Sequence, residues 1–119
     1  LRHLLRSDEG YFRGVTGEDL GDFPNEAGLG ALAERFRALA KRWESVMQDP
    51  SLPERDIDRR WDVSKGAVVL AQSIHHADDH RTQVLSILGS RGLEVPELDL
   101  WAYGTEQGTV RFKEGVPTA

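Results

Sequence analysis

The chain has 119 residues and a formal net charge of −5, from 20 acidic and 15 basic side chains. This length fits one domain, and the acidic balance argues against a general nucleic-acid binder, which needs a basic face to displace counterions. The absence of cysteine excludes disulfides, thiolate metal ligands and a cysteine nucleophile, so any metal must be bound by nitrogen and oxygen atoms.

The first two predicted helices cover about residues 1–15 and 29–48. The chain opens with LRHLLRSDEGYF, which has no initiator methionine and begins inside a helical pattern, so we expect an upstream segment to be missing or processed. Residues 16–28 are rich in Gly, Pro, Asp and Asn and predict a loop. In the second helix apolar residues recur at three- and four-residue steps, and Asp49-Pro50 ends it, because a residue before proline avoids the helical region.

The third helix is predicted at about residues 64–91, with Ser64 or Asp62 as its N-terminal cap. Residues 50–63 predict a short extended segment that covers the end of the bundle. Gly92 suits the left-handed position that follows a helix. We predict one helical domain over residues 1–104, whose last part, residues 93–104, is an ordered cap with buried Leu and Trp. A polar tail follows over residues 105–119.

Long amphipathic helices need an apolar partner to pack against. Three helices can form a bundle, but the length of these helices implies a fourth partner. The sequence leaves two alternatives open, a missing N-terminal helix or a second subunit.

Three of the four histidines fall within the stretch SIHHADDHRTQ, residues 73–83. His76 and His80 are four residues apart, so they lie one turn apart on one helix face, a spacing that allows two imidazoles to bind one divalent ion. His75 points about 100° away and is expected to flank the site. Ala77 replaces the glutamate of the zinc-protease motif H-E-x-x-H, which excludes that chemistry. Histidines at this spacing also occur on surfaces, or in cores bonded to backbone, without a metal.

His3, on the first helix, is the candidate third ligand. If the first helix packs against the third, three imidazoles from two facing helices form an open site, with positions left for water or substrate. Asp78 and Asp79 are expected to be solvated acids on the helix face, although either could bond to a ligand histidine.

The stretches HLLRSDEGYFRGV and HHADDHRTQVLSILGSRGLEVPELDLWAYG resemble the DinB-like superfamily of metal-binding four-helix bundles, and the resemblance covers nearly the whole chain. That family typically has a histidine early in its second helix with an acidic residue after it, and H-x-x-x-H followed by R-x-Q in its fourth helix. The matching residues here are His3, Glu9, His76, His80, Arg81 and Gln83.

The resemblance implies an all-α, up-down-down-up four-helix bundle whose first helix is absent from this chain. Residues 1–15 would then be the family's second helix. It further implies that His3, His76 and His80 bind one divalent cation, with nickel or zinc the usual occupants. A homodimer is an expectation from the family alone.

The family includes metal-dependent thiol S-transferases and isomerases that act on small electrophiles with a low-molecular-weight thiol cofactor. An open three-histidine centre suits this chemistry, because the ion can hold a thiol as thiolate or activate water near neutral pH. Two alternatives stay open for four further residues: a role in substrate binding, or a plain packing or surface role. These residues are Arg81, Gln83, Trp101 and Tyr103. The alternative function is a non-catalytic metal-binding or stress-related interaction domain. No apolar run approaches the ~20 residues of a membrane span, so we expect a cytoplasmic protein with no membrane or nucleic-acid partner.

Overall fold

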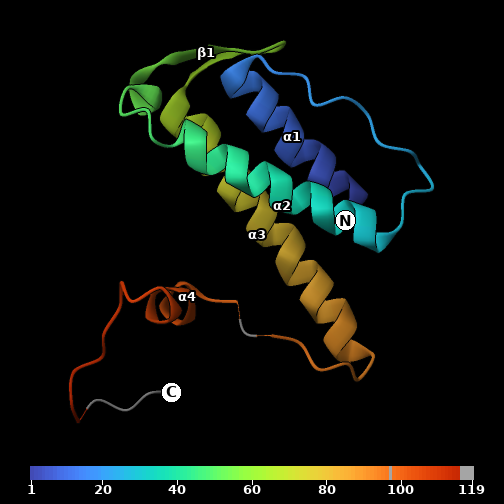
Figure 1. Ribbon diagram of the computed structural model, residues 1–119, viewed down its shortest axis with the longest axis vertical. Helices are drawn as coiled ribbons and strands as arrows, with labels where there is room; N and C mark the ends of the chain where they lie inside the picture. Colours follow the sequence, from blue (N-terminus) through green and yellow to red (C-terminus); the bar gives the residue numbers. More distant parts are fainter. Residues whose placement is uncertain (97, 116–119) are drawn as a thin grey trace. The chain divides into compact units, whose positions relative to one another are not determined.

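The computed structural model describes residues 1–96 and 98–115, which are mostly helical with one small sheet (Figure 1). The elements are α1 (Arg2–Thr16), α2 (Leu29–Val46), a 3₁₀ turn (Leu52–Glu54), β1 (Asp56–Asp58), β2 (Val63–Lys65), α3 (Gly66–Ser90) and α4 (Leu100–Glu106). The helical class predicted from the sequence is therefore confirmed, and α1, α2 and α3 match the three predicted ranges to within two residues at each end. The chain divides into two compact units, Leu1–Val84 and Leu85–Ala119.

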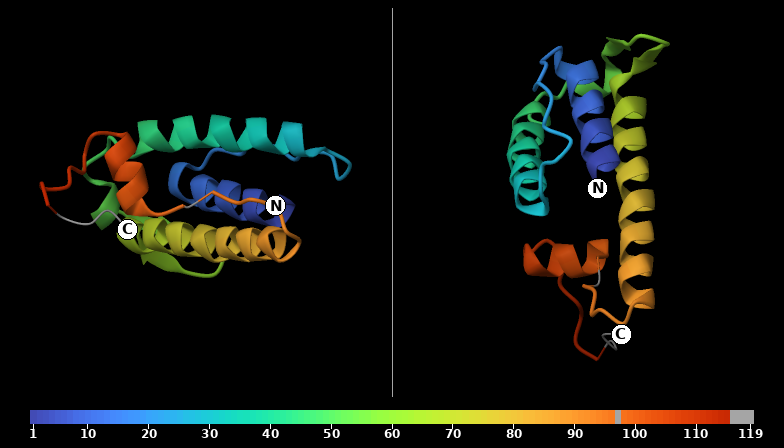
Figure 2. Two further views of the ribbon diagram at one scale, coloured as in Figure 1. Left: turned by 90° about the horizontal axis from the view of Figure 1, so that it is seen from below. Right: turned by 90° about the vertical axis from the view of Figure 1, so that its right-hand side faces the viewer.

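In the first unit, α1 lies between α2 and the part of α3 that belongs to the unit (Figure 2). Helices α1 and α2 run in the same direction, since Glu9 pairs with Arg35, and Phe12 packs edge to face against Trp43 further along both helices. Helix α3 runs the opposite way. When two consecutive helices are parallel, the loop between them must run back along the length of the first helix. Residues 17–28 form this return loop.

Two clusters of apolar side chains form the core of this unit. One joins α1 to α2 and to the connecting loop, and the other joins the end of α1 to the hairpin and the start of α3. Burial of such side chains is the dominant stabilising contribution to folding. The first cluster contains Leu5, Phe12, Phe23, Leu32 and Leu39, and the second contains Val15, Leu52, Ile57 and Val69.

Strands β1 and β2 form an antiparallel hairpin over residues 56–65, with Ile57 opposite Ser64. The prediction of an extended segment over residues 50–63 is confirmed in part. Strand β1 is extended, and its Ile57 side chain is buried in the second cluster. The capping prediction was wrong. Ser64 lies in β2 and donates to Asp62 at 2.6 Å, and α3 begins directly after the strand at Gly66.

Arg35 holds the return loop against both parallel helices. Its guanidinium makes a two-pronged contact with Glu9 of α1 at 2.5 and 2.9 Å, and it also donates to the carbonyl oxygens of Leu20 and Gly21. The side chains of this ion pair are only 25% and 11% exposed, so water weakens it less than it weakens a surface pair.

Replacing Arg35 by alanine is expected to lower the free energy of unfolding by about 1–3 kcal/mol, because it leaves the largely buried Glu9 carboxylate without this partner. The matched control is Arg42→Ala. Arg42 pairs with Glu18 at a far more exposed position, and its loss should change stability by less than about 1 kcal/mol. Urea unfolding of the two variants measures the difference, and equal losses would contradict this reading of the Arg35 contact.

The second unit contains the end of α3 and the short helix α4. Gly92 adopts the left-handed conformation expected of it, with φ of 77°, and Asp99 caps α4 by accepting a hydrogen bond from the amide of Ala102 at 2.7 Å. The expectation of buried Leu and Trp in the predicted cap was wrong, because Leu100 and Trp101 are 83% and 68% exposed. The seven-residue helix α4, which the sequence analysis missed, has only Gly104 buried. Within the described residues no helix combines the length and apolar content needed to cross a lipid bilayer.

Candidate metal centre

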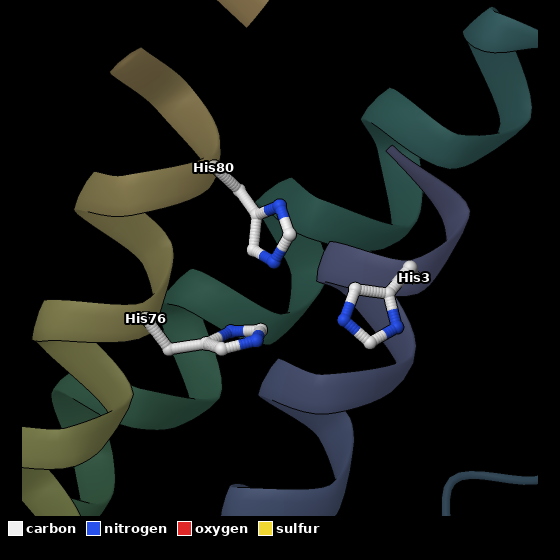
Figure 3. Close-up of side chains that lie close together, drawn as sticks. All are labelled: His3, His76 and His80. Atoms are coloured by element: carbon white, nitrogen blue, oxygen red, sulfur yellow. The ribbon is translucent and has the colours of Figure 1, made fainter. Parts of the chain in front are cut away.

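The three histidines singled out in the sequence lie together in the first unit. His3 comes from α1, and His76 and His80 come from α3; one ring nitrogen of each lies within 4.8 Å of one nitrogen of each of the others. The ring centroids are 5.5 Å apart for His3 and His76, 5.0 Å for His3 and His80, and 4.5 Å for His76 and His80. Figure 3 shows the three rings directed toward a common space between the two helices.

The antiparallel arrangement of α1 and α3 explains this convergence. His76 and His80 are one turn apart and share the face of α3 that carries the buried Val69, which packs with Val15 near the end of α1. Because the helices run in opposite directions, the start of α1 lies beside the middle of α3, and His3 in the first turn reaches the pair.

His75 lies outside the cluster. Its side chain is 70% exposed, and its Nε2 lies 3.5 Å from a carboxylate oxygen of Asp79. The prediction that His75 points away from the helix face of His76 and His80 is therefore confirmed.

The ring of His76 is the best placed of the three to bind a cation. Its Nδ1 atom is buried and has no hydrogen-bond partner among the described residues, a situation that normally costs free energy. Burial, with the charges of His80 and His3, lowers the pKa of His76, which favours the neutral ring. A neutral imidazole with a free lone pair is the form that binds a metal.

An open cavity of about 490 Å³ begins at His3, at the start of α1 and α2. Its wall is mostly apolar, and the guanidinium of Arg2 in that wall is bonded to the carbonyl oxygens of Pro24 and Ala27. The cavity leaves room for a small molecule on the α2 side of His3, and neither His76 nor His80 lines it. Its lining residues are Leu1, Arg2, His3, Ala27, Gly28, Leu29 and Leu32.

The remaining predicted residues do not join the cluster. Arg81 donates to Asp78 at 2.8 Å in an exposed ion pair, and Gln83 is exposed. Trp101 and Tyr103 belong to the second unit, and a role for them at a pocket stays a prediction.

Asp8 is a residue that the sequence analysis did not single out. It lies on α1, and burial raises the pKa of its carboxyl group to about 6 against the opposing charges of Arg81 and His80. The signal in the sequence was an acidic residue at a core position, one turn from Leu4 and from Phe12.

Comparison with known proteins identifies no relative. No protein-family model, curated protein or solved structure gives a significant match to this chain. The chemistry of the three-histidine cluster is therefore the main guide to function.

Proposed function

We propose that this protein binds one divalent cation through His3, His76 and His80. The observation that supports the proposal is the approach of three imidazole nitrogens to within 4.8 Å of one another, from two helices and with 72 residues of chain between His3 and His76. Three converging imidazoles without a cation would bring together groups that repel one another when protonated. A shared ion turns that arrangement into a favourable one.

The donor set is compatible with nickel or zinc, the occupants that the resemblance to the DinB-like superfamily implies. Imidazole nitrogen suits Zn, Cu, Fe and Ni, whereas Mg and Ca prefer oxygen ligands. Three protein ligands leave at least one coordination position for water or substrate, which is the pattern of catalytic rather than structural zinc sites. Bound there, the metal would lower the pKa of a water or thiol toward neutrality.

We further propose that the fold is a DinB-like bundle in which α1, α2 and α3 are the second, third and fourth helices. Two parallel helices followed by an antiparallel one give the down-down-up order of that bundle, and this order supports the proposal. A preceding helix or a second copy of the chain would then complete it.

Within that family, a metal-dependent thiol S-transferase or isomerase is the function that the site supports best. The three-histidine donor set supports it, because it would leave a coordination position at which the ion could bind a thiol as thiolate. The alternative is a non-catalytic metal-binding domain. Turnover with a panel of low-molecular-weight thiols and small electrophiles separates the two, and absence of turnover by metal-loaded protein would favour the alternative.

Metal analysis of untagged protein tests the binding proposal directly. We expect about one equivalent of a divalent ion, with anomalous scattering that places it between the three rings. Protein that takes up no metal after incubation with nickel or zinc would contradict the proposal.

Acidification is expected to release the metal as the pH falls through about 6. Protons compete with the cation for imidazoles whose ordinary pKa is ~6.5, so binding weakens as the pH falls. The lowered pKa of His76 means that this ring binds a proton less tightly than an ordinary imidazole, which favours the form that binds the cation. A chelator-competition titration between pH 8 and 5 measures the release, and retention well below pH 5 would indicate carboxylate ligands instead.

A further inference from the structure

Tyr11 of α1 packs against the three-histidine cluster without being one of its members. Its ring lies edge to face against the ring of His76, with the two ring centroids 6.0 Å apart and the ring planes at 69°. Aromatic pairs prefer this arrangement, with centroids about 4.5–7 Å apart, and they stabilise one another by more than the area that they bury. The contact therefore favours one orientation of the His76 ring over others.

The other side of Tyr11 is attached to the core of the first unit. Its side chain is half-buried and packs against the second apolar cluster, which joins the end of α1 to the hairpin and the start of α3. Side chains in such a core are close-packed and hold fixed rotamers. Tyr11 thus links the ring of His76 to a rigid part of the protein.

The ring of His76 lacks the usual alternative means of orientation at its Nδ1 atom. A metal-binding histidine commonly donates its second ring N–H group to a carboxylate or a carbonyl oxygen, which fixes the ring. The Nδ1 atom of His76 is buried and has no hydrogen-bond partner among the described residues. The two other rings beside His76 are those of His3 and His80, which are themselves proposed ligands. Tyr11 is the neighbouring ring that can orient His76 without binding the ion.

We propose that the ring of Tyr11 positions His76 for metal binding by holding its imidazole edge to face, in the orientation that points toward His3 and His80. The inference rests on the proposed three-histidine site and makes Tyr11 a positioning residue, not a ligand. The contact is between the two rings, so the ring of Tyr11 and not its hydroxyl group carries the role.

The first test compares the nickel affinity of purified wild-type protein with that of Tyr11→Phe and Tyr11→Leu, each by competition with a chelator at pH 8. Tyr11→Leu should bind nickel about three- to tenfold more weakly, the range that corresponds to the loss of one aromatic pair. Tyr11→Phe keeps the ring and should stay within about twofold of wild type. An equal loss in both variants would assign the effect to the hydroxyl group and overturn the inference.

Phe12→Leu is the matched control for stability. Phe12 is the next residue of α1, but it is buried and packs edge to face against Trp43 of α2, with ring centroids 5.2 Å apart. The control variant removes a similar aromatic pair that involves no histidine, so it should lower the unfolding temperature while its nickel affinity stays within about twofold of wild type. If the two leucine variants lost affinity equally, binding would merely follow stability, and Tyr11 would have no positioning role.

Nuclear magnetic resonance of the metal-free protein tests the contact itself. The ring of Tyr11 shifts the resonances of the His76 ring protons through its ring current, so Tyr11→Leu should move them and Tyr11→Phe should leave them nearly unchanged. His75 is the internal reference, because its side chain is 70% exposed and directed toward Asp79. His76 resonances that move no more than those of His75 in Tyr11→Leu would overturn the inference.

The outcomes also separate this inference from the proposed function. Wild-type protein that binds no nickel would overturn both. Wild-type protein that binds nickel while Tyr11→Leu binds it equally well would overturn only the role of Tyr11.

Discussion

Replacing either His76 or His80 by alanine is expected to weaken nickel or zinc binding by at least about 100-fold. Each variant removes one of the three ligands that converge in Figure 3, and a two-nitrogen site loses several kcal/mol of binding free energy, at about 1.4 kcal/mol for each factor of ten. His3→Ala should have an effect of similar size, because its nitrogen lies within the same 4.8 Å. Isothermal titration or competition with a chelator measures the change.

His75→Ala is the matched control for this series. It removes an imidazole next in sequence to His76 but 70% exposed and directed toward Asp79, so we expect metal affinity to remain within about threefold of wild type. Equal losses in the His75 and His76 variants would show that a different set of residues binds the metal.

Gly66→Ala is expected to lower the free energy of unfolding by about 3 kcal/mol or more. A β-carbon at residue 66 would lie 1.9 Å from the backbone oxygen of Leu52, a distance that no rotamer change can relieve. The amide of Gly66 also donates to the carbonyl of Arg55 at 2.8 Å, which fixes the residue against the hairpin. The substitution therefore forces apart the start of α3 and the 3₁₀ turn.

Gly10→Ala provides the control for helical glycine. Gly10 is exposed in the middle of α1, and a β-carbon there would meet nothing within 4 Å. Alanine is the better helix former, so this variant should gain about 0.5–1 kcal/mol. Denaturant unfolding of both variants tests the pair, and a Gly66→Ala protein as stable as wild type would contradict the close approach of α3 to Leu52.

The long helices were predictable from the sequence because their apolar residues recur with a helical period, which is a local property. The break at Asp49-Pro50 and the left-handed Gly92 are likewise local and were predicted. The hairpin was only partly predicted, since three-residue strands carry too few residues to show alternation. The capping role of Ser64 was wrong because the strand pairing of β2 competes for this residue, a contact that depends on β1.

The candidate site divides in the same way. The pairing of His76 with His80, and the exclusion of His75, follow from helix geometry alone. The approach of His3 depends on the packing of α1 against α3, which local patterns do not determine; the resemblance to the DinB-like superfamily supplied that expectation. Asp8 was missed because the sequence does not reveal that its carboxylate oxygen lacks a partner, a fact that only the packed structure contains.

The position of the three histidines has a consequence for the unfolding of this protein. A cation bound at once by His3 and by the two α3 histidines would tie together segments far apart along the chain, so that α1 could not separate from α3 until the ion dissociated. Ligand bound only by the native state adds about 2.7 kcal/mol when its free concentration is 100 times the Kd. Depletion of the ion would then remove this tie, and the amides near His3, His76 and His80 would exchange with deuterium faster than in the metal-bound protein.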